Sequence, residues 1–191
     1  ITKTEFKKLV RPVIAPTVNE RFPLTEFGNT DRMIARYGKS LMYVPETKSW
    51  YVWDKDGSNY WRKSSEATDV AYCAKQTVRA ISGEVKYHDG SDEERQRFFE
   101  FCAASQRAFM VQNMVYLASI DHNIVVPVGE LDKHSHLLGV ANGVVDLRTG
   151  ELLPADRSMR ITLNTNIDYD PLAVCPVFDQ TLSEVFYGDT E

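Results

Sequence analysis

Apolar residues recur at helical spacing in the middle of this chain and at alternating spacing on both sides of it. Between residues 65 and 83 they repeat every three or four positions, and Gly83 is placed to end that helix. A second helical stretch follows Ser91, whose spacing to Glu94 is that of a capping box, and a break near Ser105 divides it. The pattern predicts a mostly helical middle third.

Two groups of short alternating segments flank these helices. The first covers residues 41–44, 50–53 and 60–62, with turns at Pro45-Glu46-Thr47 and Asp56-Gly57. The second covers residues 138–141, 144–147 and 151–153, linked by Asn142-Gly143 and Arg148-Thr149-Gly150. Both links are good hairpin sequences, because glycine and asparagine tolerate positive φ. Each group is predicted to form a small antiparallel β meander.

Two further helices complete the prediction. One spans residues 30–37, with Asn29 as N-cap and Gly38 as its stop. The last helix begins with Pro176 at its first position. We expect this last helix to bury one apolar face, formed by Phe178, Leu182, Val185 and Phe186. The fold class is therefore α+β, with a mostly helical middle and two small antiparallel β meanders.

Composition narrows the class of protein. The 191 residues, 43% of them hydrophobic, suffice for one globular domain with a sizeable core. A net charge of -5 argues against an extended basic surface for nucleic acid, although a local patch stays open. The three cysteines are far apart and odd in number, which favours reduced thiols in a cytoplasmic protein. No segment has membrane-spanning length, so we expect no membrane partner.

Three short motifs carry candidate chemistry, and each has a simpler structural explanation. Gly38-Lys39-Ser40 could close a phosphate-binding loop, but Met33 occupies the position of the required upstream glycine, so we interpret it as a helix end. Asp54 and Asp56 could hold divalent metals for nucleotidyl transfer, or they could belong to a hairpin turn.

His134 and His136 could likewise face one metal on a strand, with Asp132 or His122 near them. No third ligand stands at a recognisable spacing. Nothing in the sequence resembles a nucleophile with its base, and we assign no catalytic, cofactor-binding or metal-binding residue.

An aromatic and basic cluster is the candidate for nucleic-acid contact. Trp53 and Trp61 lie in the first meander, and Arg62 and Lys63 follow Trp61 directly. Proteins that bind single-stranded nucleic acid combine such aromatic stacking surfaces with cations. Alternation places Trp50 and Trp53 on opposite faces, so at least one face is expected to be core. Packing and nucleic-acid contact both remain open for these residues.

One segment is specific enough to indicate a family. It is Asn142-Gly143-Val144-Val145-Asp146-Leu147-Arg148-Thr149-Gly150. Matching segments occur in the same order at residues 24–29, 43–45, 50–54, 161–162, 169–171 and 175–178. Over residues 24–191 the chain resembles the pre-ATPase domain of phage, plasmid and poxvirus-type primase-helicases, the module that precedes a superfamily III helicase. Residues 1–23 would then be a linker or the end of a preceding region.

The resemblance implies an accessory domain in DNA replication. Such a domain would position or oligomerise a hexameric ATPase ring and contact DNA, and the alternative is a metal-dependent priming domain that uses Asp54 and Asp56. The family provides no catalytic residues for this module. Because the chain starts at Ile1 and ends soon after the last helix, we expect a module of a larger enzyme, with an ATPase domain beyond residue 191 that uses ATP and magnesium. The expected location is the cytoplasm of a bacterial host.

Overall fold

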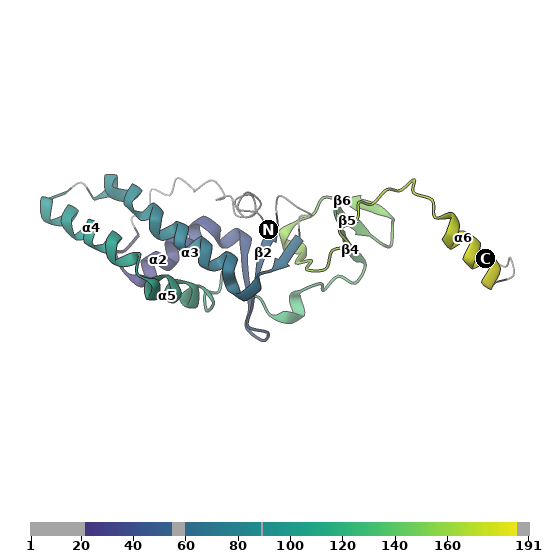
Figure 1. The fold of residues 1–191 in the computed structure, drawn as a ribbon, viewed down its shortest axis with the longest axis horizontal. Coiled ribbons are helices and arrows are strands. Elements are labelled where there is room, and N and C mark those ends of the chain that lie inside the picture. The colour runs from purple at the N-terminus through teal and green to yellow at the C-terminus, as the bar shows by residue number, and fades with distance from the viewer. Residues whose placement is uncertain (1–21, 55–59, 89, 187–191) are drawn as a thin grey trace.

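The computed structural model describes residues 22–54, 60–88 and 90–186. It confirms an α+β fold of elongated shape (Figure 1). Helices gather at one end, a three-stranded sheet lies beside them in the centre, and a second three-stranded sheet follows. The helices are α2 (Glu26–Tyr37), α3 (Thr68–Ala80), α4 (Asp92–Ser105), α5 (Ala108–Ala118) and α6 (Pro176–Val185). No helix in these described stretches could cross a lipid bilayer.

The start of α2 lies four residues before the predicted position. Its N-cap is Thr25, whose hydroxyl accepts a hydrogen bond from the Gly28 amide at 3.1 Å. Asn29, the predicted cap, is buried inside the helix and donates from Nδ2 to Ser105 Oγ at 2.9 Å. The prediction was wrong because the Asn29 side chain serves a tertiary contact with the end of α4.

Both predicted ends of the next helix also differ. Helix α3 begins at Thr68, after a 3₁₀ turn at Ser65–Ala67 in which Glu66 and Ala67 have φ of 50° and 55°. It ends at Ala80 and continues as a 3₁₀ helix over Ile81–Tyr87, so Gly83 does not end it. The broad apolar period of this region was therefore correct, whereas glycine as a stop signal was misleading.

The helix pair after Ser91 confirms the prediction. Ser91 is the N-cap of α4, and its hydroxyl accepts from the Glu94 amide at 3.2 Å. Arg107 adopts an extended backbone that separates α4 from α5, close to the predicted break. Helices α2, α3 and α5 pack on one another and enclose most of the main core.

The first meander has the predicted order β1-β2-β3, with all neighbours antiparallel. Its strands are β1 (Leu41–Val44), β2 (Ser49–Asp54) and β3 (Tyr60–Lys63). Trp50 and Val52 point into the helical core. Trp53 and Trp61 lie in a second, smaller cluster with Met42. Both faces of this sheet are therefore covered by side chains of the chain itself.

The second meander is confirmed as β4-β5-β6, with strands β4 (Leu137–Val140), β5 (Gly143–Asp146) and β6 (Glu151–Leu153). Val140 pairs with Gly143, so the two loop residues are Ala141 and Asn142. Of the predicted Asn142-Gly143 pair, only Gly143 has positive φ, at 156°. Its missing Cβ matters, because a Cβ there would lie 2.5 Å from the Leu153 carbonyl oxygen.

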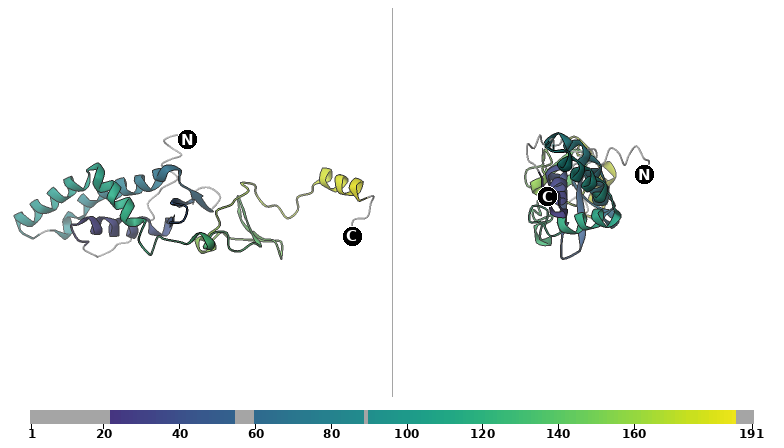
Figure 2. Two further views of the ribbon diagram at one scale, coloured as in Figure 1. Left: turned by 90° about the horizontal axis from the view of Figure 1, so that it is seen from below. Right: turned by 90° about the vertical axis from the view of Figure 1, so that its left-hand side faces the viewer.

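The chain after β6 returns to the first sheet before it reaches α6. Trp61 donates its backbone amide to Ile161 O at 2.9 Å, which joins segments 100 residues apart in sequence. Helix α6 then lies apart from the rest of the described structure, at the end of an extended segment, in both Figure 1 and Figure 2. Pro176 is at its first turn as predicted.

The expected burial of the apolar face of α6 was wrong within this chain. Phe178 is 57% exposed, Val185 61% and Phe186 54%, and Leu182 is only partly covered. The physical reason is distance, because the chain after Tyr169, which still bonds to Asn142 and Gly150, carries the helix away from both sheets.

Candidate nucleic-acid interface

The two tryptophans predicted to touch nucleic acid lie inside the molecule. Trp53 is 7% exposed and Trp61 5%. Their ring centroids are 5.5 Å apart in an edge-to-face arrangement, and Trp61 Nε1 donates to Arg157 O at 2.9 Å. The Arg157 guanidinium lies over the Trp53 ring, 5.6 Å from its centroid. In this arrangement the rings offer no free stacking face, and packing explains both of them.

The two cations behind them differ from each other. Arg62 Nη2 contacts Asp69 Oδ2 at 3.2 Å, and that same oxygen accepts from Ser64 Oγ at 2.8 Å. Arg62 therefore ties the end of β3 to the start of α3. Lys63 is exposed, and its ammonium has no partner in the described part of the chain. Nucleic-acid contact by either cation stays a prediction.

The structure brings Lys63 together with a residue that the sequence did not single out. Lys48, in the turn between β1 and β2, lines the same cavity of about 410 Å³ as Lys63. Tyr43, Trp50 and Tyr116 also line it. The predicted meander could have indicated this proximity. In an antiparallel meander the end of β3 lies beside the start of β2, which the turn containing Lys48 precedes.

Of the two carboxylates proposed as metal ligands, the structure describes only Asp54. Asp54 ends β2 and pairs in register with Tyr60, whereas Asp56 lies outside the described residues. Within the described stretches, no three histidine, cysteine or acidic side chains are grouped as a metal site would require. The priming alternative that uses Asp54 and Asp56 stays untested.

The two histidines lie close together, but the Asp132 carboxylate, the acidic ligand that the sequence suggested for them, is already engaged in hydrogen bonds. The rings of His134 and His136 have centroids 5.7 Å apart and are tilted by 64°. The Asp132 carboxylate accepts hydrogen bonds from the Thr162 amide at 2.7 Å and from the Thr162 hydroxyl. It holds the segment after β6 in place, which explains its position without a metal.

Gly38-Lys39-Ser40 is a helix end, as the sequence predicted. The three residues form a 3₁₀ turn between α2 and β1, which is the reverse of the strand-loop-helix order of a phosphate-binding loop. The Gly38 amide donates to Ile34 O and so continues the hydrogen bonding of α2. That amide is therefore not directed at a phosphate.

A family model described as D5 N terminal like matches residues 30–187, which is most of the chain. The chain belongs to this D5 N-terminal-like family. The match confirms the resemblance drawn from residues 142–150, and it identifies the chain as an N-terminal domain of the D5-like primase-helicase type. No curated protein matches the chain.

Family membership changes how the D5 N-terminal-like domain is interpreted. It implies association with a helicase domain in the parent protein, in the context of DNA replication. The match begins at Thr30, inside α2, and extends through α6, so both sheets and the projecting helix belong to the family unit. The exposed face of α6 is therefore a feature of the domain to be explained.

Proposed function

We propose that this D5 N-terminal-like domain is an accessory module of a phage or plasmid DNA replication primase-helicase. It positions or oligomerises the ATPase ring of the parent protein and contacts the DNA that the ring handles. ATP and magnesium act in the ATPase domain, and the assembled form is a homo-hexamer in the host cytoplasm. The family match supports the replication setting. The exposed face of α6 carries the positioning role.

Helix α6 has the features of a docking element. It has ten residues, and isolated helices shorter than about 12–15 residues are only marginally stable in water. Phe178, Leu182 and Val185 share one face at spacings of four and three residues, the spacing of helices that lie in apolar grooves. The described part of this chain leaves that face exposed. A partner surface on the ATPase domain would bury it and stabilise the helix.

A pair of double variants in the ATPase-bearing parent protein tests this role. Phe178→Ser/Leu182→Ser removes two apolar contacts, each worth about 1.5–3 kcal/mol when buried, so hexamers should dissociate and DNA-stimulated ATP hydrolysis should fall. The matched control, Gln180→Ser/Glu184→Ser, has the same spacing on the opposite face and should leave both unchanged. Mass photometry measures the assembly state. Intact hexamers with normal ATPase activity in the first variant would contradict the proposal.

A further inference from the structure

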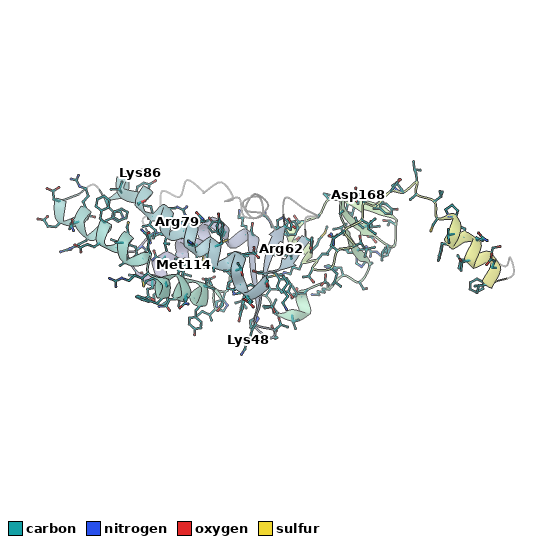
Figure 3. All side chains as sticks on the ribbon, viewed as in Figure 1. Lys48, Arg62, Arg79, Lys86, Met114 and Asp168 are labelled. Carbon is teal, nitrogen blue, oxygen red and sulfur yellow. The ribbon has the colours of Figure 1, made fainter. Side chains whose placement is uncertain are left out.

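The cavity at Lys48 and Lys63 has the size and lining of a small-ligand site. Its volume is about 410 Å³, within the range of roughly 300–1,000 Å³ usual for ligand pockets. Three parts of the fold line this open cavity: the turn between β1 and β2, the end of β3 with the following 3₁₀ turn, and one face of α5. Figure 3 shows Lys48 at the outer edge of the molecule, far from Arg79 on α3.

The two lysines at this cavity differ from the arginines of this chain that form ion pairs. Lys48 and Lys63 are exposed, and neither ammonium has a partner among the described residues. By contrast, Arg32, Arg62 and Arg160 each contact a carboxylate. The cavity lining includes one acidic side chain, Glu66, so it carries a net positive charge. An anionic group between the two lysines would be attracted electrostatically and would give both cations a partner.

Aromatic and polar groups stand beside the two cations. Tyr116 on α5 lines the cavity and is 65% exposed, so a face of its ring is accessible to a flat ligand. Gln112, one turn earlier on the same helix, is exposed and offers an amide that can donate and accept hydrogen bonds. Phosphate, base ring and base edge are thus each matched by a chemically suited group in one cavity.

The backbone around the cavity is held in an unusual conformation. Lys48, Glu66 and Ala67 have φ of 49°, 50° and 55°, a left-handed region that residues with a Cβ rarely adopt. All three line this one cavity. Such conformations persist when the surrounding structure holds them in place, and they cluster at sites of ligand contact. Tyr43 and Trp50, whose ring centroids are 4.9 Å apart, also line the cavity.

We propose that this cavity binds one nucleotide unit of single-stranded DNA. The phosphate contacts the ammonium groups of Lys48 and Lys63, and the base stacks on Tyr116 with its edge toward Gln112. A single strand fits because its bases are free to leave the stack and reach an aromatic ring, whereas the bases of a duplex are paired and stacked. This inference rests on the DNA contact in the proposed function and places it at residues other than Trp53 and Trp61.

Binding of a labelled oligo-dT to the 191-residue chain, measured by fluorescence anisotropy at low salt, tests the site. Lys48→Gln/Lys63→Gln should weaken binding at least tenfold, because two phosphate contacts are lost. The control Lys75→Gln/Arg79→Gln removes the same charge from exposed positions on α3 and should change binding less than threefold. Equal losses in the two double variants would mean nonspecific attraction and would overturn the site.

Two further arms separate the sources of the nucleotide. Tyr116→Ala should weaken binding several-fold and Tyr116→Phe should restore it, since stacking needs the ring and not the hydroxyl. Free dTMP and ATP should not displace the oligonucleotide at equal nucleotide concentration, and duplex DNA should bind more weakly. Displacement by the free nucleotides, or duplex binding as tight as that of the single strand, overturns the inference. All variants are at exposed positions, so unchanged melting temperatures will show that the fold is intact.

The outcome is separable from the role of α6. If the chain binds no oligonucleotide at low salt, the cavity inference fails, whereas the assembly of the parent protein is judged by the Phe178→Ser/Leu182→Ser experiment alone. If the oligonucleotide binds equally well to both double variants, DNA contact stands and this site for it is wrong.

Discussion

Residues 22–124 and residues 137–186 differ in how they cover their apolar side chains. The main core is drawn wholly from the first region and includes Met33, Phe98 and Ile124, all at most 1% exposed. In the second region the buried apolar side chains are confined to four positions among the described residues, Val140, Val144, Val145 and Ile161. More apolar side chains of this region are exposed than buried, among them Leu172 at 86% and Val174 at 82%. The first region therefore builds the main core from its own residues, whereas the described part of the second region leaves more of its apolar surface uncovered.

The largest effect should come from the buried ion pair of the first region. The Arg32 side chain is 0% exposed, donates to Glu84 Oε1 at 3.0 Å and to Glu84 Oε2 at 2.9 and 2.8 Å, and also donates to Pro23 O at 2.8 Å. Arg32→Ala leaves that carboxylate and the carbonyl without their donor, so unfolding in denaturant should need about 3–5 kcal/mol less free energy. Arg95→Ala, which breaks an exposed pair with Asp92, should lose no more than about 1 kcal/mol.

Similar stability of these two variants, which both change a residue of the first region, would contradict this prediction. It would mean that the buried guanidinium contributes no more than a surface one, and that the tight packing around α2 is not what holds the region together.

A smaller effect is expected in the second region. Gly143→Val would place a β-branched side chain at φ of 156° and against the Leu153 carbonyl, so we expect a loss of about 1–3 kcal/mol. Gly129→Ala is the control, because a Cβ there meets nothing within 4 Å. Amide exchange resolved by region should show the loss in β4–β6 with α2–α5 unchanged. Parent-like melting of the valine variant would show that the turn is misassigned.

The smallest effect is a pH dependence at the same meander. Hydrogen bonds from the Arg148 side chain, then from its backbone amide, lower the pKa of Asp146 from 3.8 to about 2. Because the folded pKa is depressed, this contribution to stability is present above pH 4 and lost as pH falls toward 2. Asp146→Asn should therefore flatten the melting temperature between pH 4 and pH 2. An unchanged slope in that variant would assign the acid sensitivity to other carboxyl groups.

Local signals predicted the elements of this fold, and tertiary contacts decided what the sequence could not. Alternation and turn residues were sufficient for both meanders, because these strands pair with sequence neighbours. The start of α2 was missed because Asn29 is engaged by Ser105, 76 positions away. The burial of Trp61 depends on Arg157 and Ile161, equally remote in sequence.

The candidate site was only partly predictable for the same reason. Lys63 was singled out from its aromatic neighbours, whereas Lys48 lines the same cavity only because of the strand pairing and the turn geometry of the first sheet. The apolar period of α6 correctly predicted a helix, but the burial predicted for its apolar face was wrong within the described residues. An amphipathic pattern does not say whether the covering surface lies in the same chain, and here the described residues do not supply it.

The protection of α6 against hydrogen exchange tests the central claim most directly. In the 191-residue chain alone, the amides of residues 177–185 should exchange almost as fast as in an unfolded peptide, because ten uncovered residues make a marginal helix. In the parent protein with its ATPase domain, the same amides should exchange at least 100-fold more slowly, while those of α2 and α5 stay protected in both. Equal protection of α6 in the two proteins would contradict the claim that the second region is completed by a partner.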